Sequence, residues 1–399
     1  MIKVAILGFG VVGGGVADLL TNNKKEVSAL GGDDIEIKYI LDLRDFPASP
    51  FADRVIHDFD TILSDDEVDC VIEVMGGSHP AYEYTISALR AGKHVITSNK
   101  EVVAKYGDEF LAEAERAGVC YCFEAAVGGG IPVIAPIIGF VKQNKLREIR
   151  GILNGTTNYI LTKMFRHGES FDVALKDAQS KGYAERNPDA DILGTDASRK
   201  IAILTSLVTG RLVPTEAIHT EGITAIRSED VKAAESLGMQ IKLLGRSIIN
   251  EESIEIMVAP FMIPEGMPLA SVSGVYNAVE VIGEPIGNIM FYGPGAGAGA
   301  TASAVVGDLM QIMRSARACA QPSMTKTADS VVDFDSFEAR QYIALCGVNK
   351  SKIEAEFGNV QYIEADGEIA FVTEKLREKD VVSALERLQA DLRSRIRLV

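Results

Sequence analysis

A glycine fingerprint near the start of the chain restricts the folds available to it. The pattern G-x-G-x-x-G stands directly after a short apolar run and opens a helical pattern. In such a unit the first glycine permits a tight turn, the second lets a pyrophosphate approach the backbone, and the third lets helix and strand pack closely. The helix N-terminus supplies amide donors and partial positive charge. The predicted dinucleotide contacts are Gly8, Phe9, Gly10, Val11, Val12 and Gly13.

Apolar runs alternate with helical patterns over residues 1–130. The predicted strands are Lys3–Leu7, Ile35–Leu41, Cys70–Met75, Val95–Ser98 and Val119–Glu124. Helices are predicted at Pro80–Ala91 and Glu109–Ala117, each followed by a glycine suited to the left-handed position after a helix. This alternation predicts an α/β fold with a Rossmann-type parallel sheet, and an NAD(P)-binding domain over residues 1–130.

Two charged residues after the second predicted strand bear on the choice of cofactor. Asp42 is placed to bond a ribose hydroxyl, as in NAD, whereas Arg44 is placed to hold the 2′-phosphate of NADP. Both cofactors therefore stay open, as does the alternative that these are plain surface charges. Asp42 comes later than the usual spacing of about 20 residues, which we attribute to a longer connection over residues 21–34.

The rest of the chain divides into two further predicted parts. A glycine- and proline-rich break at residues 128–132 predicts a boundary, and residues 131–299 are expected to form a mixed α+β domain. Residues 300–325, after a glycine loop, are predicted to pack back on the first domain. Residues 336–399 have a βαββαβ order that matches the ferredoxin-like class and is expected to complete a unit of its own.

Within residues 131–299 three elements are predicted more closely. Ser170 is expected to cap a helix, and strands are expected at Ser253–Ile263 and Val275–Ile282.

Composition limits the partners. With 56 acidic against 40 basic side chains the net charge is −16, and no basic stretch is long enough to follow a phosphate backbone, which excludes nucleic acid or an anionic membrane as the main partner. The chain shows neither a secretory leader nor an apolar run that approaches a membrane span. Five cysteines without a C-x-x-C pair favour free thiols and a cytoplasmic location.

Lysines and carboxylates mark a candidate reaction site. Asp196 and Lys200 are four residues apart on a predicted helix that Thr195 is expected to cap, so they share one face, and the apolar character of this helix favours an interior position at the lip of a cleft over a surface ion pair. Residues 182–191 hold three more carboxylates, which suit a substrate ammonium group unless they form a solvated acidic loop. Lys100 follows a parallel strand at the end where open α/β sheets bind ligands.

Taken together, these segments resemble homoserine dehydrogenase. The matching segments are Gly8–Gly13, Glu73–Gly77, Thr97–Lys100, Glu124–Pro132, Asn154–Leu161, Gly182–Lys200 and Gly293–Gly297. They follow one another in order up to about residue 320. The resemblance implies an NAD(P)H-dependent, reversible reduction of L-aspartate 4-semialdehyde to L-homoserine in threonine, methionine and isoleucine biosynthesis, carried out by a homodimer or homotetramer. It implies that residues 131–299 form the domain for substrate binding, catalysis and dimerisation.

The resemblance also implies roles for single residues. Lys200 would be the proton donor, and Lys100 would lie between nicotinamide and substrate. Gly76 and Gly295 would join the cofactor contacts. The implied substrate pocket consists of Glu185, Asp191, Asp196, Asn154, Thr156 and Tyr183. A sodium-type cation would be held by the backbone around Glu124, Val127, Gly129 and Ile131.

The last segment leaves two interpretations open. It resembles the ACT domain that some family members carry, which implies an amino-acid effector such as threonine, while the alternative is a packing role alone. No kinase segment precedes the fingerprint, so the chain resembles the stand-alone form. Cutting after Asp335 is expected to leave an active enzyme without an effector response. The competing functional hypothesis is a regulatory protein that senses a dinucleotide and an amino acid without catalysis.

Overall fold

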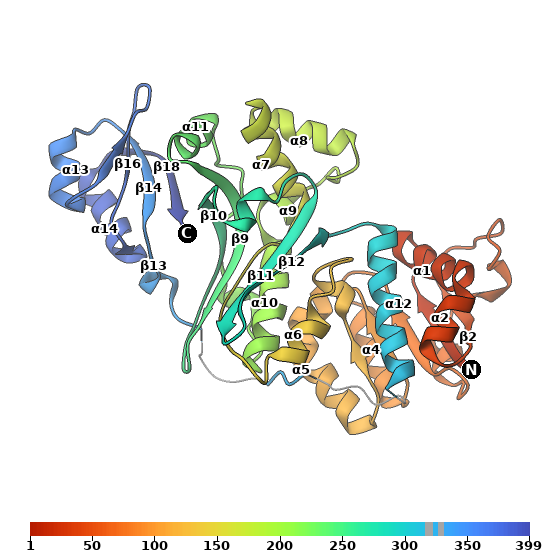
Figure 1. Ribbon diagram of the computed structural model, residues 1–399. Coiled ribbons are helices and arrows are strands. Elements are labelled where there is room, and N and C mark those ends of the chain that lie inside the picture. The colour runs from red at the N-terminus through yellow and green to blue at the C-terminus, as the bar shows by residue number, and fades with distance from the viewer. Residues whose placement is uncertain (316–321, 326–330) are drawn as a thin grey trace. The chain divides into compact units, whose positions relative to one another are not determined.

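The computed structural model describes residues 1–315, 322–325 and 331–399 (Figure 1). Among these residues two compact units are found. The first unit comprises Met1–Lys145, Ala202–Thr215 and Gly293–Thr327, and the second comprises Leu146–Ile201, Glu216–Tyr292 and Ala328–Val399. No helix in the described ranges is long and apolar enough to cross a membrane.

The first unit is built on a parallel six-stranded sheet with the order β3-β2-β1-β4-β5-β6. Its strands are β1 (Ile2–Leu7), β2 (Ile35–Leu41), β3 (Val55–Ile56), β4 (Cys70–Glu73), β5 (His94–Thr97) and β6 (Tyr121–Cys122). Successive residues Val4, Ala5, Ile6 and Leu7 are all fully buried, so both faces of the sheet are covered. The predicted Rossmann-type sheet is confirmed, with the strand order of doubly wound nucleotide-binding folds.

Helices cover this sheet, and one of them comes from a distant part of the chain. The helices are α1 (Val11–Asn22), α2 (Lys24–Gly31), α3 (Asp60–Leu63), α4 (Ala81–Arg90), α5 (Lys100–Ala117), α6 (Ile134–Phe140) and α12 (Ala298–Arg314), with short 3-10 turns η1 (Ala52–Arg54) and η2 (Glu124–Ala126). Helix α12 lies along α1 (Figure 1), and Ala302, Val305 and Leu309 share a core with Val16 and Leu20. Residues 316–321, which the sequence also places here, lie outside the described residues.

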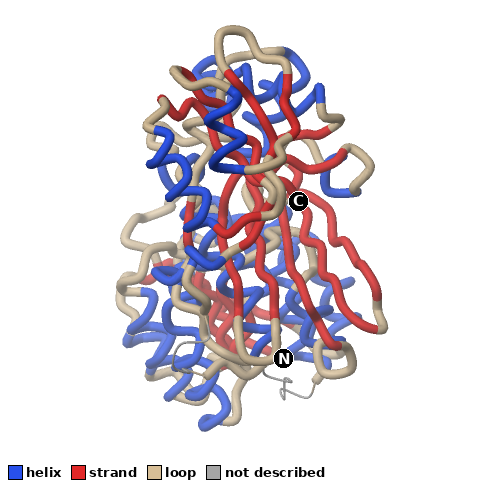
Figure 2. The backbone as a smooth tube through the Cα atoms, turned by 90° about the vertical axis from the view of Figure 1, so that its left-hand side faces the viewer, coloured by secondary structure: helices blue, strands red, loops and turns tan. Residues whose placement is uncertain are grey.

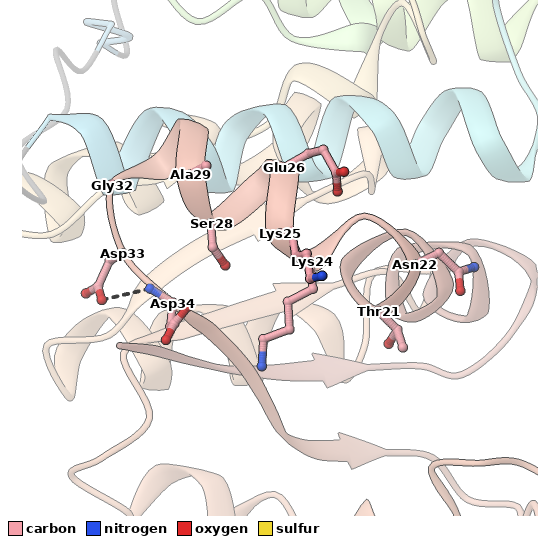
Figure 3. A pocket seen from close by; sticks show the side chains of 10 residues that line it. All are labelled: Thr21, Asn22, Lys24, Lys25, Glu26, Ser28, Ala29, Gly32, Asp33 and Asp34. Atoms are coloured by element: carbon pink, nitrogen blue, oxygen red, sulfur yellow. Dashed lines mark hydrogen bonds between the residues drawn. The ribbon is translucent and has the colours of Figure 1, made fainter.

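The longer connection between the fingerprint helix and Asp42 contains the short helix α2, which follows α1 directly. An open depression of about 1030 Å³ lies over this helix and its flanking turns (Figure 3). The labelled side chains that line it are Thr21, Asn22, Lys24, Lys25, Glu26, Ser28, Ala29, Gly32, Asp33 and Asp34. No fingerprint residue is among them, so this depression is separate from the predicted cofactor site.

The second unit is built on a ten-stranded sheet whose long strands run side by side (Figure 2). Nine strands follow the order β12-β11-β7-β9-β10-β18-β14-β16-β15, and β8 pairs with β10. The strands are β7 (Lys145–Ile152), β8 (His219–Thr220), β9 (Met239–Ile249), β10 (Ile254–Pro264), β11 (Tyr276–Glu284), β12 (Gly287–Pro294), β14 (Gln341–Cys346), β15 (Gln361–Ile363), β16 (Ile369–Val372) and β18 (Asp391–Leu398). A separate pair is formed by β13 (Glu338–Ala339) and β17 (Leu376–Arg377).

Helices of the second unit carry most of the predicted substrate residues. They are α7 (Gly155–His167), α8 (Phe171–Ser180), α9 (Asp189–Ile192), α11 (Ser228–Ser236), α13 (Lys350–Phe357) and α14 (Glu378–Leu388), with 3-10 turns η4 (Pro268–Ser271) and η5 (Phe334–Ser336). Helix α10 (Thr195–Thr209) has residues in both units, and η3 (Thr215–Ala217) lies where the chain returns to the second. Ser170 occupies the N-cap position of α8 as expected, although its side chain makes no capping hydrogen bond. Thr195 is the first residue of α10 rather than the residue before it, so the cap expected there is wrong.

The last segment has the expected βαββαβ order but does not form a sheet of its own. Strand β18 lies between β14 and β10, and it pairs in parallel with β10 at Phe261–Arg397 and Met262–Leu398. The segment has a hydrophobic core of its own around Ile343, Phe357 and Phe371, but its sheet is continuous with that of the preceding strands. The pairing of β10 with β18 at these two positions joins the strands of both segments into one sheet.

The expectation of free thiols is confirmed for three of the cysteines in the described residues. Cys70, Cys122 and Cys346 are free, whereas Cys120 is engaged in a disulfide bond, and Cys319 lies outside the described residues. The expectation is wrong for Cys120, because an odd number of cysteines does not exclude a single pair.

Candidate active site

The fingerprint has the backbone geometry that a pyrophosphate requires. Gly8 has a positive φ of 94°, and a Cβ on Gly13 would stand 1.9 Å from the Gly8 carbonyl oxygen, so helix and strand approach as closely as predicted. A Cβ on Gly10 would meet no atom within 4 Å, which leaves space over the turn. These positions fit a bound dinucleotide.

A cavity of about 440 Å³ opens at the carboxyl ends of β1, β2 and β4. Its lining consists of Gly8, Gly10, Leu41, Asp42, Leu43, Arg44, His57, Val74, Met75, Pro80 and Tyr84. The predicted residues Phe9, Val11 and Val12 lie in the same turn, with Val11 exposed. Open parallel sheets bind ligands at such a crevice, where the strand order changes direction.

Asp42 and Arg44 form a bidentate pair beside this cavity. Arg44 Nε donates to Asp42 Oδ1 and Arg44 Nη2 donates to Asp42 Oδ2, each at 3.0 Å. Asp42 Oδ2 also accepts from the backbone amide of Phe9 at 2.8 Å, which ties the fingerprint to β2. The Arg44 guanidinium holds the pKa of Asp42 well below its usual range, against the effect of burial. Arg44 is largely exposed and can turn toward a ligand, whereas Asp42 is anchored.

We expect Arg44→Ala to raise the Kd of NADPH by about tenfold to a hundredfold, because a charged contact to the 2′-phosphate is lost. The Kd of NADH should change less than threefold or fall, since Asp42 is released for the ribose hydroxyls. Titration of nicotinamide fluorescence gives both constants, and Arg116→Ala on the exposed end of α5 is the matched control. Equal effects on the two cofactors would remove Arg44 from cofactor selection.

Glu73 is a buried carboxylate that was not assigned to the site from the sequence. It connects the loop after β4 with the end of β5. Glu73, the last residue of β4, accepts from the backbone amide of Met75 (2.8 Å) and from Thr97 Oγ1 (2.6 Å). Asn99 caps α5 through the amide of Glu101 and donates from Nδ2 to the Gly77 carbonyl (2.7 Å). Burial raises the pKa of Glu73, and these hydrogen bonds oppose the shift. A carboxylate at the end of an otherwise apolar buried strand was the available signal.

These bonds fix two residues expected to face the cofactor. Gly76 lies in the β4 loop with a φ of 85°. Lys100 is the half-buried first residue of α5 and belongs to the first unit, whereas Lys200 belongs to the second.

Two glycine-rich loops of the first unit lie backbone against backbone. A Cβ on Gly129, whose φ is 58°, would stand 2.3 Å from the carbonyl oxygen of Gly295, and the Gly130 amide donates to the Pro294 carbonyl. This places the loop expected to hold a cation beside the loop expected to contact the cofactor. Both Val127 and Ile131 are buried in it.

The Glu124 side chain has a role that its assignment to a cation site did not foresee. Its carboxylate accepts from the backbone amides of Val133, Ile134 and Ala135 at 2.6 to 2.8 Å, at the start of α6. The amide of Glu124 donates to Asp308 Oδ2 on α12 (2.9 Å), and burial together with the Glu124 charge raises the pKa of Asp308 well above its usual range. No group of three or more His, Cys, Asp or Glu in the described chain is arranged to hold a metal ion.

In the second unit Asn154, the residue before α7, forms hydrogen bonds with two carboxylates of the predicted acid–base cluster. Asn154 caps α7 by accepting from the Thr157 amide at 2.9 Å. Its Nδ2 donates to Asp191 Oδ1 at 2.6 Å and to Asp196 Oδ2 at 2.9 Å. The structure therefore brings two of the expected substrate carboxylates together from α9 and α10.

Lys200 completes this cluster from the next turn of α10. Its Nζ donates to Asp196 Oδ2 and to the Leu153 carbonyl oxygen, both at 2.8 Å. Lys200 is 7% exposed and Asp196 is 4% exposed, so the pair is not an ordinary surface ion pair. An ammonium held at two acceptors in a buried site has a fixed direction and one remaining proton to offer.

The other expected substrate residues lie in the adjoining loop. Thr156 Oγ1 donates to the Tyr183 carbonyl oxygen at 2.6 Å, and the Tyr183 side chain is exposed beside Tyr159. The Glu185 backbone carbonyl accepts from Gln179, and its exposed carboxylate lies outside the hydrogen-bonded Asn154 cluster formed by the described residues.

In the described part of the second unit, Lys242 is a second buried lysine besides Lys200, and the sequence did not reveal it. From β9 its Nζ donates to the Val272 carbonyl oxygen (2.6 Å) and to Asn158 Oδ1 on α7 (3.2 Å). Burial lowers the pKa of Lys242 to about 8. Asn158 in turn donates to the Tyr276 carbonyl (3.0 Å), so this lysine fixes α7, and with it Asn154, against the start of β11.

A Rossmann sheet with an open fingerprint, together with a buried lysine–carboxylate cluster, defines an NAD(P)-dependent oxidoreductase. Residues 8–124 match the family described as Homoserine dehydrogenase, NAD binding domain, and residues 132–310 match the family described as Homoserine dehydrogenase. The chain belongs to the homoserine dehydrogenase family, which confirms the resemblance and favours the enzyme over the regulatory alternative.

Individual relatives agree with this result. A homoserine dehydrogenase of Neisseria gonorrhoeae is 37% identical over 98% of this chain and 95% of its own length, and one of Synechocystis is 43% identical over 78% and 73%. A crystal structure of a homoserine dehydrogenase from Thiobacillus denitrificans covers all of this chain and 98% of its own, with 35% identity and a TM-score of 0.93. A hyperthermophilic archaeal homoserine dehydrogenase mutant in complex with NADPH covers 78% of this chain and 97% of its own, with 26% identity and a TM-score of 0.67.

Proposed function

We propose that the protein catalyses the reversible, NAD(P)H-dependent reduction of L-aspartate 4-semialdehyde to L-homoserine, with Lys200 as the proton donor. The observation that carries the proposal is the buried Lys200 ammonium, oriented by Asp196 and by the Leu153 carbonyl at the start of α7. A bound reduced nicotinamide supplies the hydride for the aldehyde carbon.

The protein's residues then handle the proton. As the aldehyde oxygen gains negative charge, the Lys200 ammonium stabilises it and transfers a proton from Nζ to it, which gives the hydroxyl group of homoserine. Asp196 keeps the ammonium in place during this transfer. In the oxidative direction the neutral Lys200 amine accepts the hydroxyl proton. Lys100 is proposed to contact both nicotinamide and substrate from the start of α5.

The amino-acid end of the substrate is proposed to bind at the neighbouring carboxylates. Asp191 and Asp196 share the Asn154 amide, and together with Glu185 they provide negative charge for an ammonium group. Thr156 and Tyr183 line the same pocket in this proposal.

The direct test is absorbance at 340 nm with purified protein, L-homoserine and either oxidised cofactor. We expect reduced nicotinamide to accumulate, and omission of homoserine to abolish it. A regulatory protein that only senses its ligands would bind the cofactor and leave the absorbance unchanged.

Glu185→Gln is expected to lower kcat/KM for homoserine by about tenfold or more while the Kd of the cofactor stays the same, because a charged contact to the substrate ammonium is lost and the cofactor binds elsewhere. Steady-state kinetics and nicotinamide fluorescence measure the two constants. Asp172→Asn, an exposed carboxylate in the first turn of α8 in the same unit, is the matched control. An unchanged kcat/KM rejects the assignment, and a changed cofactor Kd assigns Glu185 to the other ligand.

Several finer proposals accompany this function. The cofactor is NADP or NAD, and a sodium-type cation binds the backbone around Glu124, Val127, Gly129 and Ile131. The ACT-like segment binds an amino-acid effector such as threonine, and the enzyme works as a homodimer or homotetramer in the cytoplasm. The βαββαβ order of residues 341–398 supports the effector site, and three free thiols support the location.

A further inference from the structure

A fully buried arginine lies at the junction between the last strand and the rest of the second unit. Arg397 on β18 donates from Nε (2.6 Å) and Nη2 (3.0 Å) to the carboxylate of Glu378, and both residues are 0% exposed. Arg395 and Gln341 also contact Glu378, each at 3.0 Å. The third guanidinium nitrogen, Nη1, does not bond Glu378 but contacts a different part of the chain.

That nitrogen, Nη1 of Arg397, donates to Glu221 Oε2 at 2.8 Å. His219 contacts the other oxygen of Glu221 at 2.7 Å, and its ring stacks on Phe334, which also faces the Arg397 guanidinium. Burial alone would raise the pKa of Glu221, but His219 and Arg397 outweigh it and lower the pKa to about 2. Glu221 is therefore ionised and held from two sides.

The backbone around Glu221 packs on the turn between α9 and α10. The Ile223 amide donates to the Ile192 carbonyl at 2.9 Å. A Cβ on Gly222 would stand only 2.1 Å from that same oxygen, and a Cβ on Gly194 would stand 3.2 Å from the Glu221 carbonyl. At such distances neither segment can shift without moving the other.

The turn held in this way connects the two carboxylates of the proposed substrate site. Asp191 precedes Ile192 directly, and Asp196 follows Gly194 by two residues. Both carboxylates bond Asn154, and Asp196 also bonds Lys200. A displacement of this turn would therefore also displace the carboxylates of Asp191 and Asp196.

We infer that Arg397 and Glu221 are positioning residues for the substrate site, through which strand β18 fixes the turn between Asp191 and Asp196. The inference rests on the proposed function, since that function assigns both aspartates to the substrate. Buried ion pairs add little net stability compared with apolar packing, because desolvation offsets their attraction. Their strict geometry is what suits this one to setting the position of a loop.

Glu221→Gln is the central test, because it keeps the side-chain volume and leaves the Arg397–Glu378 pair intact. We expect the KM for homoserine to rise about tenfold, kcat to change less than threefold, and the Kd of NADPH to stay the same. Amide hydrogen exchange over residues 189–200 should become faster without substrate present. Glu356→Gln, which removes an exposed ion pair with Arg387, is the matched control and should change none of these quantities.

Two further variants complete the test. Arg397→Lys keeps a cation near Glu221 and should raise the KM less than Arg397→Met does, which a loss of stability alone would not produce. Asp191→Asn reports on the proposed site itself and should raise the KM. If Asp191→Asn raises the KM while Glu221→Gln changes neither the KM nor the exchange rate, the positioning role is wrong and the proposed function stands. If neither variant changes the KM, the substrate assignment of Asp191 fails, and the inference fails with it.

Discussion

Lys200→Ala should lower kcat by roughly 10²–10⁴-fold, the usual range for loss of a general acid. The ammonium is buried and has two fixed acceptors, so water cannot readily take its place and orientation. Both directions of the reaction should be affected alike, because the same nitrogen donates the proton in reduction and accepts it in oxidation. Initial rates at saturating homoserine and at saturating aldehyde measure the effect.

The Lys200 variant needs a check on folding and on the cofactor. Asp196 keeps its bond to Asn154 after the substitution, so the fold should survive, and the Kd of NADPH should be unchanged. Lys181→Ala, which removes an exposed lysine from the same unit, is the matched control and should keep kcat within twofold. Near-normal turnover by a folded Lys200→Ala protein would remove this residue from the mechanism.

Deleting the residues after Asp335 should abolish folding of the second unit, contrary to what the sequence predicts. The deletion removes β18 from its place between β10 and β14, so Phe261 and Met262 lose their strand partners. It also removes Phe337 and Ala339 from the core that they share with β9 and β10. It also removes Arg397, the partner of Glu221.

Circular dichroism and light scattering on the truncated protein measure this outcome, with aggregation as the expected result. Arg397→Met retains the β18 backbone and should fold, which separates the loss of the strand from the loss of its charge. A monodisperse truncated protein that oxidises homoserine would restore the view of a removable segment. A threonine response is therefore better sought with point variants in the full chain.

The first unit could be predicted well because its signals are local. The fingerprint and the alternating apolar runs gave Ile35–Leu41 with the bounds that β2 has, and the glycine positions follow from turn geometry alone. In the second unit β7 and β9 were missed. Arg150 is buried on β7 and Arg246 is half-buried on β9, where Glu280 and Glu148 neutralise them from neighbouring strands. A buried charge looks like a surface charge until its partner is known.

The candidate site shows the same division. The spacing of Asp196 and Lys200 on one helix indicated their pairing, since residues four apart share a face. Asn154 as the link to Asp191, Glu73 as the tie between two loops, and Lys242 beneath α7 join residues more than 20 positions apart. Such contacts depend on how strands and helices are brought together.

The sequence by itself determined the nucleotide-binding fold of the first unit, its cofactor turn and the residues of the acid–base cluster, because short-range periodicity, glycine conformation and helical spacing are properties of neighbouring residues. Only the tertiary structure decided that the last βαββαβ segment shares the ten-stranded sheet of the unit that holds the proposed substrate residues. That pairing joins residues 261 and 397 through backbone hydrogen bonds, which carry no side-chain signal in the sequence. The contact of Arg397 with Glu221 depends on this pairing, and it is the contact through which we propose that the last strand positions the substrate site.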